Sequence, residues 1–199
     1  MFPILRRANE RELPNIYLIM KNLLMVSVLG LLILYYPLKI VLSEWLPNYK
    51  ESLMYLALIF PILIFEGKMS LLINTYFKTL RKEKVMLKIN LIIIPISIII
   101  TLITTLMLNS IDLAVLSVVI ILSIRCVLSE LILSKLLNII IYKDIILELA
   151  MTLVFIITAW YLNTFHSIYI YVIAYVLYLF VKRKEIKLTI VNLKSLIKN

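Results

Sequence analysis

Four charged side chains lie inside long apolar stretches of this sequence: Glu66, Lys68, Arg125 and Glu130. A charged side chain at the centre of a membrane-spanning segment costs about 2.5–3.5 kcal/mol, so such residues face a protein interior or a water-filled cavity rather than lipid. Acidic and basic groups in that setting either neutralise one another across helices or bind a charged solute. These four residues are therefore the first candidates for function.

Helical geometry predicts which of these charges pair. At about 100° per residue, Glu66 and Lys68 point about 200° apart, and Arg125 and Glu130 point about 140° apart, so neither couple pairs within its own helix. Glu66 and Arg125 lie ~21 Å and ~18 Å from the starts of their apolar stretches. We predict a Glu66–Arg125 bridge between parallel helices, with Lys68 and Glu130 paired about one turn deeper. The alternative for Lys68 and Glu130 is that both side chains reach the cytoplasmic interface.

The other polar residues are expected to have structural rather than functional roles. Asn74 and Asn90 are expected to form hydrogen bonds between helices. His166 has no second His or carboxylate nearby, so we expect an exposed loop residue and no metal site. Cys126 is the only cysteine, which excludes an internal disulfide and a cysteine-based zinc site. With two glycines and no P-loop, the sequence argues against ATP-driven transport, and we predict no cofactor and no catalytic residue.

The elements that must position these residues are membrane-spanning helices. Of the 199 residues, 63% are hydrophobic and 16% are charged, and the mean hydropathy is +1.06. Soluble domains have about 45–50% apolar residues and disordered chains have fewer, so both classes are excluded. Because backbone amides in lipid need internal hydrogen bonds, the continuous apolar runs favour an all-α membrane bundle. We predict six spanning helices at about residues 22–42, 52–77, 89–111, 113–137, 145–163 and 168–181. Pro37, Pro61 and Pro95 are expected to bend these helices without ending them.

The connections between the predicted helices alternate between basic and non-basic. Lys and Arg gather in residues 1–21, 78–88, 135–143 and 182–199, whereas the connection at 43–51 has one Lys against two Glu and the other two have none. Because Lys and Arg concentrate on the cytoplasmic side, this alternation predicts six crossings with both termini in the cytoplasm. The net charge of +10 is then a topology signal and an attraction to anionic lipid headgroups, and we expect no nucleic-acid partner.

The sequence divides into a transmembrane domain, residues 1–181, and a basic tail, residues 182–199. In the tail, apolar residues recur at helical spacing with Lys between them: Ile186, Ile190, Leu193 and Ile197. The pattern predicts an amphipathic helix that anchors the chain on the inner leaflet. A lipid-sensing or partner-binding role for this helix is the alternative.

Several stretches resemble bacterial polysaccharide-export flippases of the multidrug/oligosaccharidyl-lipid/polysaccharide exporter superfamily. They are WLPNYKES at 45–52, FEGKMS at 65–70, NTYFKTLRKEK at 74–84 and SIRCVLSE at 123–130. The resemblance implies a transporter in the bacterial cytoplasmic membrane. It would move lipid-linked oligosaccharide, on an undecaprenyl-pyrophosphate carrier, to the outer leaflet for surface polysaccharide biosynthesis. It also implies a cavity lined by charged side chains. Arg125 and Lys68 are the candidate cations for the substrate headgroup, with Glu66 and Glu130 beside them.

Family members have two six-helix lobes, and this chain resembles only the C-terminal part of such a protein. The expected partners are therefore the lipid-linked glycan, membrane lipids, and the N-terminal lobe or another copy of the chain. The alternative is a non-transporting scaffold subunit of a glycan-assembly complex, in which Glu66 and Arg125 are structural. An enzyme acting on a polyprenyl lipid would need clustered carboxylates such as Glu130, Asp144 and Glu148, and we do not expect one.

Overall fold

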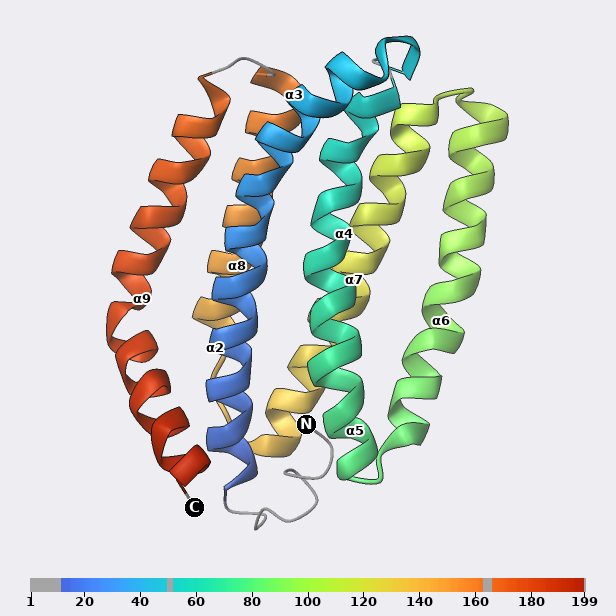
Figure 1. The fold of residues 1–199 in the computed structure, drawn as a ribbon. Helices are drawn as coiled ribbons and strands as arrows, with labels where there is room; N and C mark the ends of the chain where they lie inside the picture. The colour runs from blue at the N-terminus through green and yellow to red at the C-terminus, as the bar shows by residue number, and fades with distance from the viewer. Residues whose placement is uncertain (1–11, 50–51, 163–165, 199) are drawn as a thin grey trace.

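A computed structural model describes the backbone of residues 12–49, 52–162 and 166–198, and the side chains of those residues up to 192. Within these ranges the chain forms helices joined by short connections, and no strand. The main helices are α2 (Leu13–Leu31), α3 (Tyr35–Trp45), α4 (Leu56–Lys68), α5 (Asn74–Thr79), α6 (Glu83–Leu102), α7 (Ile111–Leu137), α8 (Tyr142–Ile156) and α9 (Ser167–Lys198). Figure 1 shows the long helices standing side by side as one bundle.

Short helical segments join several of these helices into longer rods. A 3-10 turn, Leu32–Leu34, links α2 to α3, and a second, Ser52–Tyr55, leads into α4. A π-helical segment, Met69–Ile73, links α4 to α5, and two others extend α6 and α8 as Ile103–Met107 and Ile157–Leu162. The resulting helical stretches long and apolar enough to cross a membrane are Leu13–Trp45, Ser52–Thr79, Glu83–Met107, Ile111–Leu137 and Tyr142–Leu162. The protein is therefore an all-α, multi-pass membrane protein by length and composition.

None of the three prolines ends its helical stretch, as expected. Pro61 and Pro95 lie inside α4 and α6, which continue past them. Pro37 lies in the first turn of α3, directly after the 3-10 turn. A first-turn proline removes no helical hydrogen bond, so the path from α2 into α3 continues.

Two helix boundaries differ most from the sequence prediction. The first helix begins at Leu13, with a proline in its first turn, and not near residue 22. Lys21, predicted to lie in the basic N-terminal segment, is therefore inside α2 and buried. The predicted sixth span and the predicted tail form one continuous helix, α9. No glycine or proline occurs between residues 167 and 198 to interrupt it, although Figure 1 shows α9 bending along its length.

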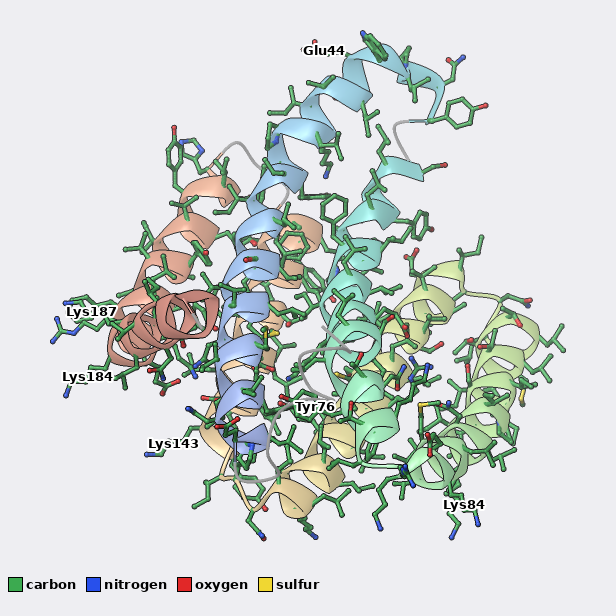
Figure 2. The ribbon with its side chains drawn as sticks, turned by 60° about the horizontal axis from the view of Figure 1, so that its bottom comes forward. Glu44, Tyr76, Lys84, Lys143, Lys184 and Lys187 are labelled. Atoms are coloured by element: carbon green, nitrogen blue, oxygen red, sulfur yellow. The ribbon has the colours of Figure 1, made fainter. Side chains whose placement is uncertain are left out.

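The two ends of the bundle differ in charge. Helix α2 begins and α9 ends at the same end of the bundle (Figure 1). Figure 2 shows Lys84, Lys143, Lys184 and Lys187 gathered toward this end, and Glu44 at the other. We call the end with these lysines the basic end.

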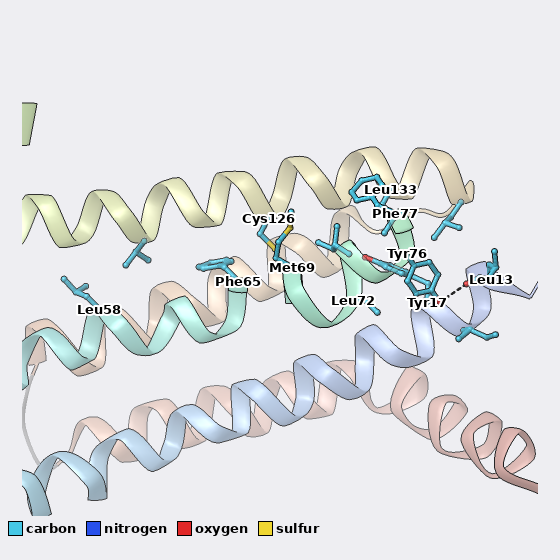
Figure 3. Close-up of a cluster of buried hydrophobic side chains, with 14 residues drawn as sticks. Leu13, Tyr17, Leu58, Phe65, Met69, Leu72, Tyr76, Phe77, Cys126 and Leu133 are labelled. Atoms are coloured by element: carbon cyan, nitrogen blue, oxygen red, sulfur yellow. Dashed lines mark hydrogen bonds between the residues drawn. The ribbon is translucent and has the colours of Figure 1, made fainter. Parts of the chain in front are cut away.

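Helix α4 occupies the middle of the bundle. It packs against α2, α7 and α8, whereas α6 lies outside and packs mainly on α7. One apolar cluster fills the space between α2, α4–α5 and α7 (Figure 3), where the Tyr17 and Tyr76 rings meet edge to face at 5.1 Å. The Tyr76 hydroxyl donates to the backbone oxygen of Leu13 at 3.3 Å, which ties the start of α2 to α5. A second cluster, which includes Tyr35, Phe155 and Tyr171, packs α2–α3 against α4, α8 and α9.

Candidate functional site

Six buried or nearly buried charged residues from five helices meet inside the bundle. We call this group the central network. Its members are Lys21 of α2, Lys68 of α4, Glu130 of α7, Asp144 and Glu148 of α8, and Lys182 of α9. Among the main helices of the spanning bundle, only α3, α5 and α6 contribute no residue to it.

Lys68 lies between two carboxylates. Its Nζ forms ion pairs with Glu130 and with Glu148. The exposed fractions of the three side chains are 3%, 0% and 8%. Lys68 is the last residue of α4, and the π-helical segment begins directly after it. Such one-turn irregularities often occur at functional positions.

Lys21 contacts every carboxylate of the network. Its Nζ is 2.8 Å from Glu130 Oε1, 3.3 Å from Asp144 Oδ2 and 3.5 Å from Glu148 Oε1. These contacts are ion pairs rather than well-aligned hydrogen bonds. The Tyr17 hydroxyl, one turn before Lys21 on α2, donates to Glu130 Oε1 at 3.2 Å. Glu130 thus receives two ammonium groups and a hydroxyl.

Lys182 closes the network on the side of α9. Its Nζ forms ion pairs with Asp144 and with Glu185, the latter at 2.5 Å, and donates to Asn22 Oδ1 at 3.4 Å. Burial alone would lower the pKa of Lys182, but the hydrogen bonds to Asp144 and Glu185 and the negative charges of these two carboxylates together raise it. The side chain therefore carries its charge at neutral pH.

Helical spacing explains how so few residues make so many contacts. Asp144 and Glu148 are four residues apart on α8, and residues with this spacing share one face of a helix. Tyr17 and Lys21 have the same spacing on α2. Each of these two helix faces points toward the other helices, because its remaining side chains are apolar and buried in the core.

The central network is balanced in charge. Within the network three ammonium groups, Lys21, Lys68 and Lys182, meet three carboxylates, Glu130, Asp144 and Glu148. The carboxylate of Glu185, which is 51% exposed, contacts Lys182 from outside the network. Buried ions are expensive to desolvate, and removing one partner of a buried pair costs about 3–5 kcal/mol. The stability of the bundle therefore depends on this charge balance, whether or not the network also binds a substrate.

A second ion pair lies farther from the basic end. Arg125 Nη2 of α7 is 2.6 Å from Glu66 Oε1 of α4, with exposed fractions of 22% and 42%. This bridge and the Lys68–Glu130 pair confirm both pairings predicted from helix angle and depth. The alternative, in which Lys68 and Glu130 reach the membrane interface, is not what the structure shows, because both side chains are buried.

The other sequence-predicted residues have mixed outcomes. The amide oxygens of Asn74 and Asn90 are buried without a hydrogen-bond partner, so the expected bonds between helices are not formed by these atoms. His166 is exposed, as expected. In the described residues, no group of three His, Cys, Asp or Glu side chains is placed to hold a metal ion.

Sequence reasoning assigned Lys21 and Lys182 to the basic connections and missed both as network residues. It considered Asp144 and Glu148 only for an enzyme. A signal for Lys21 exists, because residues 16–20 before it are apolar and no glycine or proline separates them from the long run that follows. That pattern is typical of a lysine inside a helix.

The network links five helices through ion pairs. If α2 moved away from α8, Lys21 would keep Glu130 of α7, and if α9 moved away from α8, Lys182 would keep Glu185 of its own helix. Freeing either ammonium group to bind an anion therefore requires these remaining pairs to open as well. In the arrangement that the structure shows, every ammonium group of the network is already neutralised by a carboxylate.

The chain matches no family model, no curated protein and no solved structure.

Proposed function

We propose that the protein is a membrane transporter of the flippase type, which moves an anionic lipid-linked oligosaccharide across the bacterial cytoplasmic membrane. The central network is the observation that carries the proposal. It places three ammonium groups inside a bundle of apolar helices. Buried charges are rare in membrane helices, and when present they commonly mark the pathway of an ion or a charged substrate.

In this proposal the anionic headgroup replaces the carboxylates as partner of Lys21, Lys68 and Lys182, while the isoprenoid tail stays in lipid. The headgroup needs the ion pairs to open, because the closed network has no spare positive charge. Arg125, a candidate from the sequence, is a weaker choice for this role. It is paired with Glu66 away from the network.

The proposed topology has six crossings, with both termini in the cytoplasm and the basic end at the cytoplasmic face. Helix α9 supplies the sixth crossing. Its apolar part is about 14 residues long and would span only ~21 Å at 1.5 Å per residue, so this crossing is short. The gathering of Lys84, Lys143, Lys184 and Lys187 at one end supports this orientation. Alternating access needs a second lobe, which we propose is an N-terminal lobe or another copy of the chain.

The test reconstitutes the full chain in vesicles with a fluorescent polyprenyl-pyrophosphate oligosaccharide and follows its movement with a membrane-impermeant quencher. We expect the charge-balanced variant Lys68→Met/Glu130→Gln to remain folded but to move the lipid at least about tenfold more slowly. Lys84→Met, which changes an exposed lysine at the basic end, is the matched control and should keep the wild-type rate. Normal transport by the double variant would contradict the role of the network.

A non-transporting scaffold is the second candidate, and one observation favours it: every charge in the network is already paired. A fully neutralised network is what a purely structural joint between helices requires. The same vesicles separate the two candidates. If the folded wild-type chain does not accelerate lipid movement, either alone or with the second lobe supplied, the scaffold is the better description.

A further inference from the structure

The Glu66–Arg125 ion pair is partly exposed near the middle of the spanning helices. The two side chains are 42% and 22% exposed, whereas Lys68 and Glu130, which pair between the same two helices, are 3% and 0% exposed. Glu66 lies ~21 Å and ~20 Å along the helix from the two ends of the stretch Ser52–Thr79. A glutamate side chain is too short to reach either membrane surface from this depth.

The exposed side of the pair lies between helices α4 and α6. Figure 1 shows these two helices standing on either side of α7. Around α7, Arg125 is about 40° from Ile121, which packs on α6, and about 100° from Cys126, which packs in the apolar cluster with α4. On α4, Ser70 follows Glu66 by four residues and is also exposed. We call the surface formed by Glu66, Ser70 and Arg125 the polar face.

Hydrocarbon is an unfavourable environment for the polar face. Charged side chains inside a membrane face protein or water rather than lipid. Along α4 the polar face is bordered by exposed apolar side chains, Ile59, Leu63 and Leu71, which belong in the hydrocarbon layer. A polar centre with an apolar border is what an interface between membrane helices requires, because polar side chains bond there across the helices. A second protein surface with polar groups at the same depth would therefore cover the polar face.

We propose that the polar face is the interface with a second copy of this chain. Two copies with the same orientation in the membrane are related by a two-fold axis along the membrane normal, so equivalent residues keep the same depth. Glu66 and Arg125 are 2.6 Å apart and therefore lie at one level. Around such an axis, Glu66 of each copy is opposite Arg125 of the other, and the contact occurs twice.

The ion pair has the capacity for these additional contacts. Within one copy the bond joins Arg125 Nη2 to Glu66 Oε1. A carboxylate has a second oxygen and a guanidinium has further N–H donors. Two acids and two bases then form a neutral group that both copies shield from lipid. An unrelated membrane helix would have to supply an acid and a base of its own at this depth, so the charge pattern favours a second copy. The dimer does not depend on which substrate is transported.

Energy transfer between copies of the full chain in lipid vesicles tests the dimer. The parent chain is Cys126→Ala/Lys84→Cys, in which a donor or an acceptor dye is attached at the exposed residue 84. The two labelled populations are mixed and then diluted with lipid. We expect energy transfer to persist on dilution and to give a dissociation constant for the dimer. A parent chain that shows only the transfer of random encounters would overturn the proposal.

Two double variants of this parent chain locate the interface. Glu66→Met/Arg125→Met makes the polar face apolar, and the bundle should still fold because both charges leave together. We expect this variant to raise the dissociation constant at least about tenfold. Lys68→Met/Glu130→Gln is the matched control, because it removes a buried pair between the same helices, and it should dimerise like the parent chain. Equal dimerisation of both variants would overturn the proposed interface.

Distances between spin labels locate the interface without changing its charges. Ile59→Cys or Ile173→Cys, each in the Cys126→Ala chain, gives one label per copy at an exposed position ~9–11 Å along the helix from the end opposite the basic end. Ile59 borders the polar face, whereas Ile173 is on α9, which α2 separates from α4 (Figure 1).

Passing from α4 across α2 to α9 adds about 16–20 Å in each copy. The labels at residue 173 should therefore be farther apart than those at residue 59 by at least about 20 Å. Equal distances, or a shorter distance at residue 173, would place the contact on another face and overturn the proposal. This measurement also decides the question if Glu66→Met/Arg125→Met does not fold.

Discussion

Removing the charge of Glu130 is the most direct test of the central network. Glu130 is 0% exposed and receives Lys21, Lys68 and the Tyr17 hydroxyl. Glu130→Gln keeps the size of the side chain but leaves three ammonium groups facing two carboxylates. No water reaches the site to compensate, because Lys21 and Lys68 are 1% and 3% exposed.

The expected loss is large compared with the stability of a typical protein. Removing one partner of a buried ion pair costs about 3–5 kcal/mol. The total free energy of unfolding of a typical protein is about 5–15 kcal/mol. The double variant Lys68→Met/Glu130→Gln restores the balance, with two ammonium groups and two carboxylates. Since replacing both partners of a buried pair is often neutral, we expect the double variant to recover most of that loss.

The assay is the thermal midpoint of detergent-solubilised protein, followed as loss of the monodisperse peak in fluorescence-detected size exclusion. Glu130→Gln should melt at a markedly lower temperature than wild type, and the double variant should lie close to wild type. Lys84→Met controls for loss of a lysine at an exposed position and should change the free energy by no more than about 0.5 kcal/mol. If the single variant is as stable as wild type, or the double variant is no better than the single, the charge-balance reasoning is wrong.

Two matched pairs of variants test the packing between helices. A Cβ at Gly30 would lie 2.9 Å from the Tyr175 hydroxyl oxygen, so Gly30→Ala should cost about 1–3 kcal/mol by displacing that ring. A Cβ at Gly67 meets nothing within 4 Å, so Gly67→Ala should be neutral or stabilise by up to about 1 kcal/mol, as measured by the same thermal assay. The buried Tyr171 hydroxyl donates to a backbone oxygen of α2 at 2.9 Å, so Tyr171→Phe should cost about 0.5–1.5 kcal/mol. Tyr169→Phe removes a hydroxyl from a ring that is 65% exposed, and a loss as large as that of Tyr171→Phe would contradict the assignment.

Helix angle and depth were enough to predict two of the ion pairs inside the bundle, Glu66–Arg125 and Lys68–Glu130, but not the pairs of Lys68 with Glu148 and of Glu130 with Lys21. Glu66 and Arg125 lie at similar depths on two helices that run in the same direction, and the structure joins them at 2.6 Å. The argument works because a charged side chain inside a long apolar segment must face an oppositely charged partner or water rather than lipid. It needs only the rise of a helix and the direction of each span, and both can be read from sequence.

The same reasoning failed for charges near the ends of the spans. A lysine at a span end can reach the membrane surface or turn inward to a carboxylate, and the local sequence of Lys21 or Lys182 is compatible with both. The choice depends on which helices are neighbours. Asp144 reaches Lys21 and Lys182 because α8 lies beside both α2 and α9 in the bundle. That arrangement is tertiary, and hydropathy along the chain does not contain it.

The misplaced lysines do not weaken the topology prediction, because the two kinds of inference use different residues. Without Lys21, the N-terminal segment still has Arg6, Arg7 and Arg11, and without Lys182 the last segment still has Lys184 and Lys187. The alternation of basic and non-basic connections therefore survives the removal of both network lysines. A topology based on charge counts tolerates such an error because it sums over a segment. A site depends on single side chains and does not tolerate it.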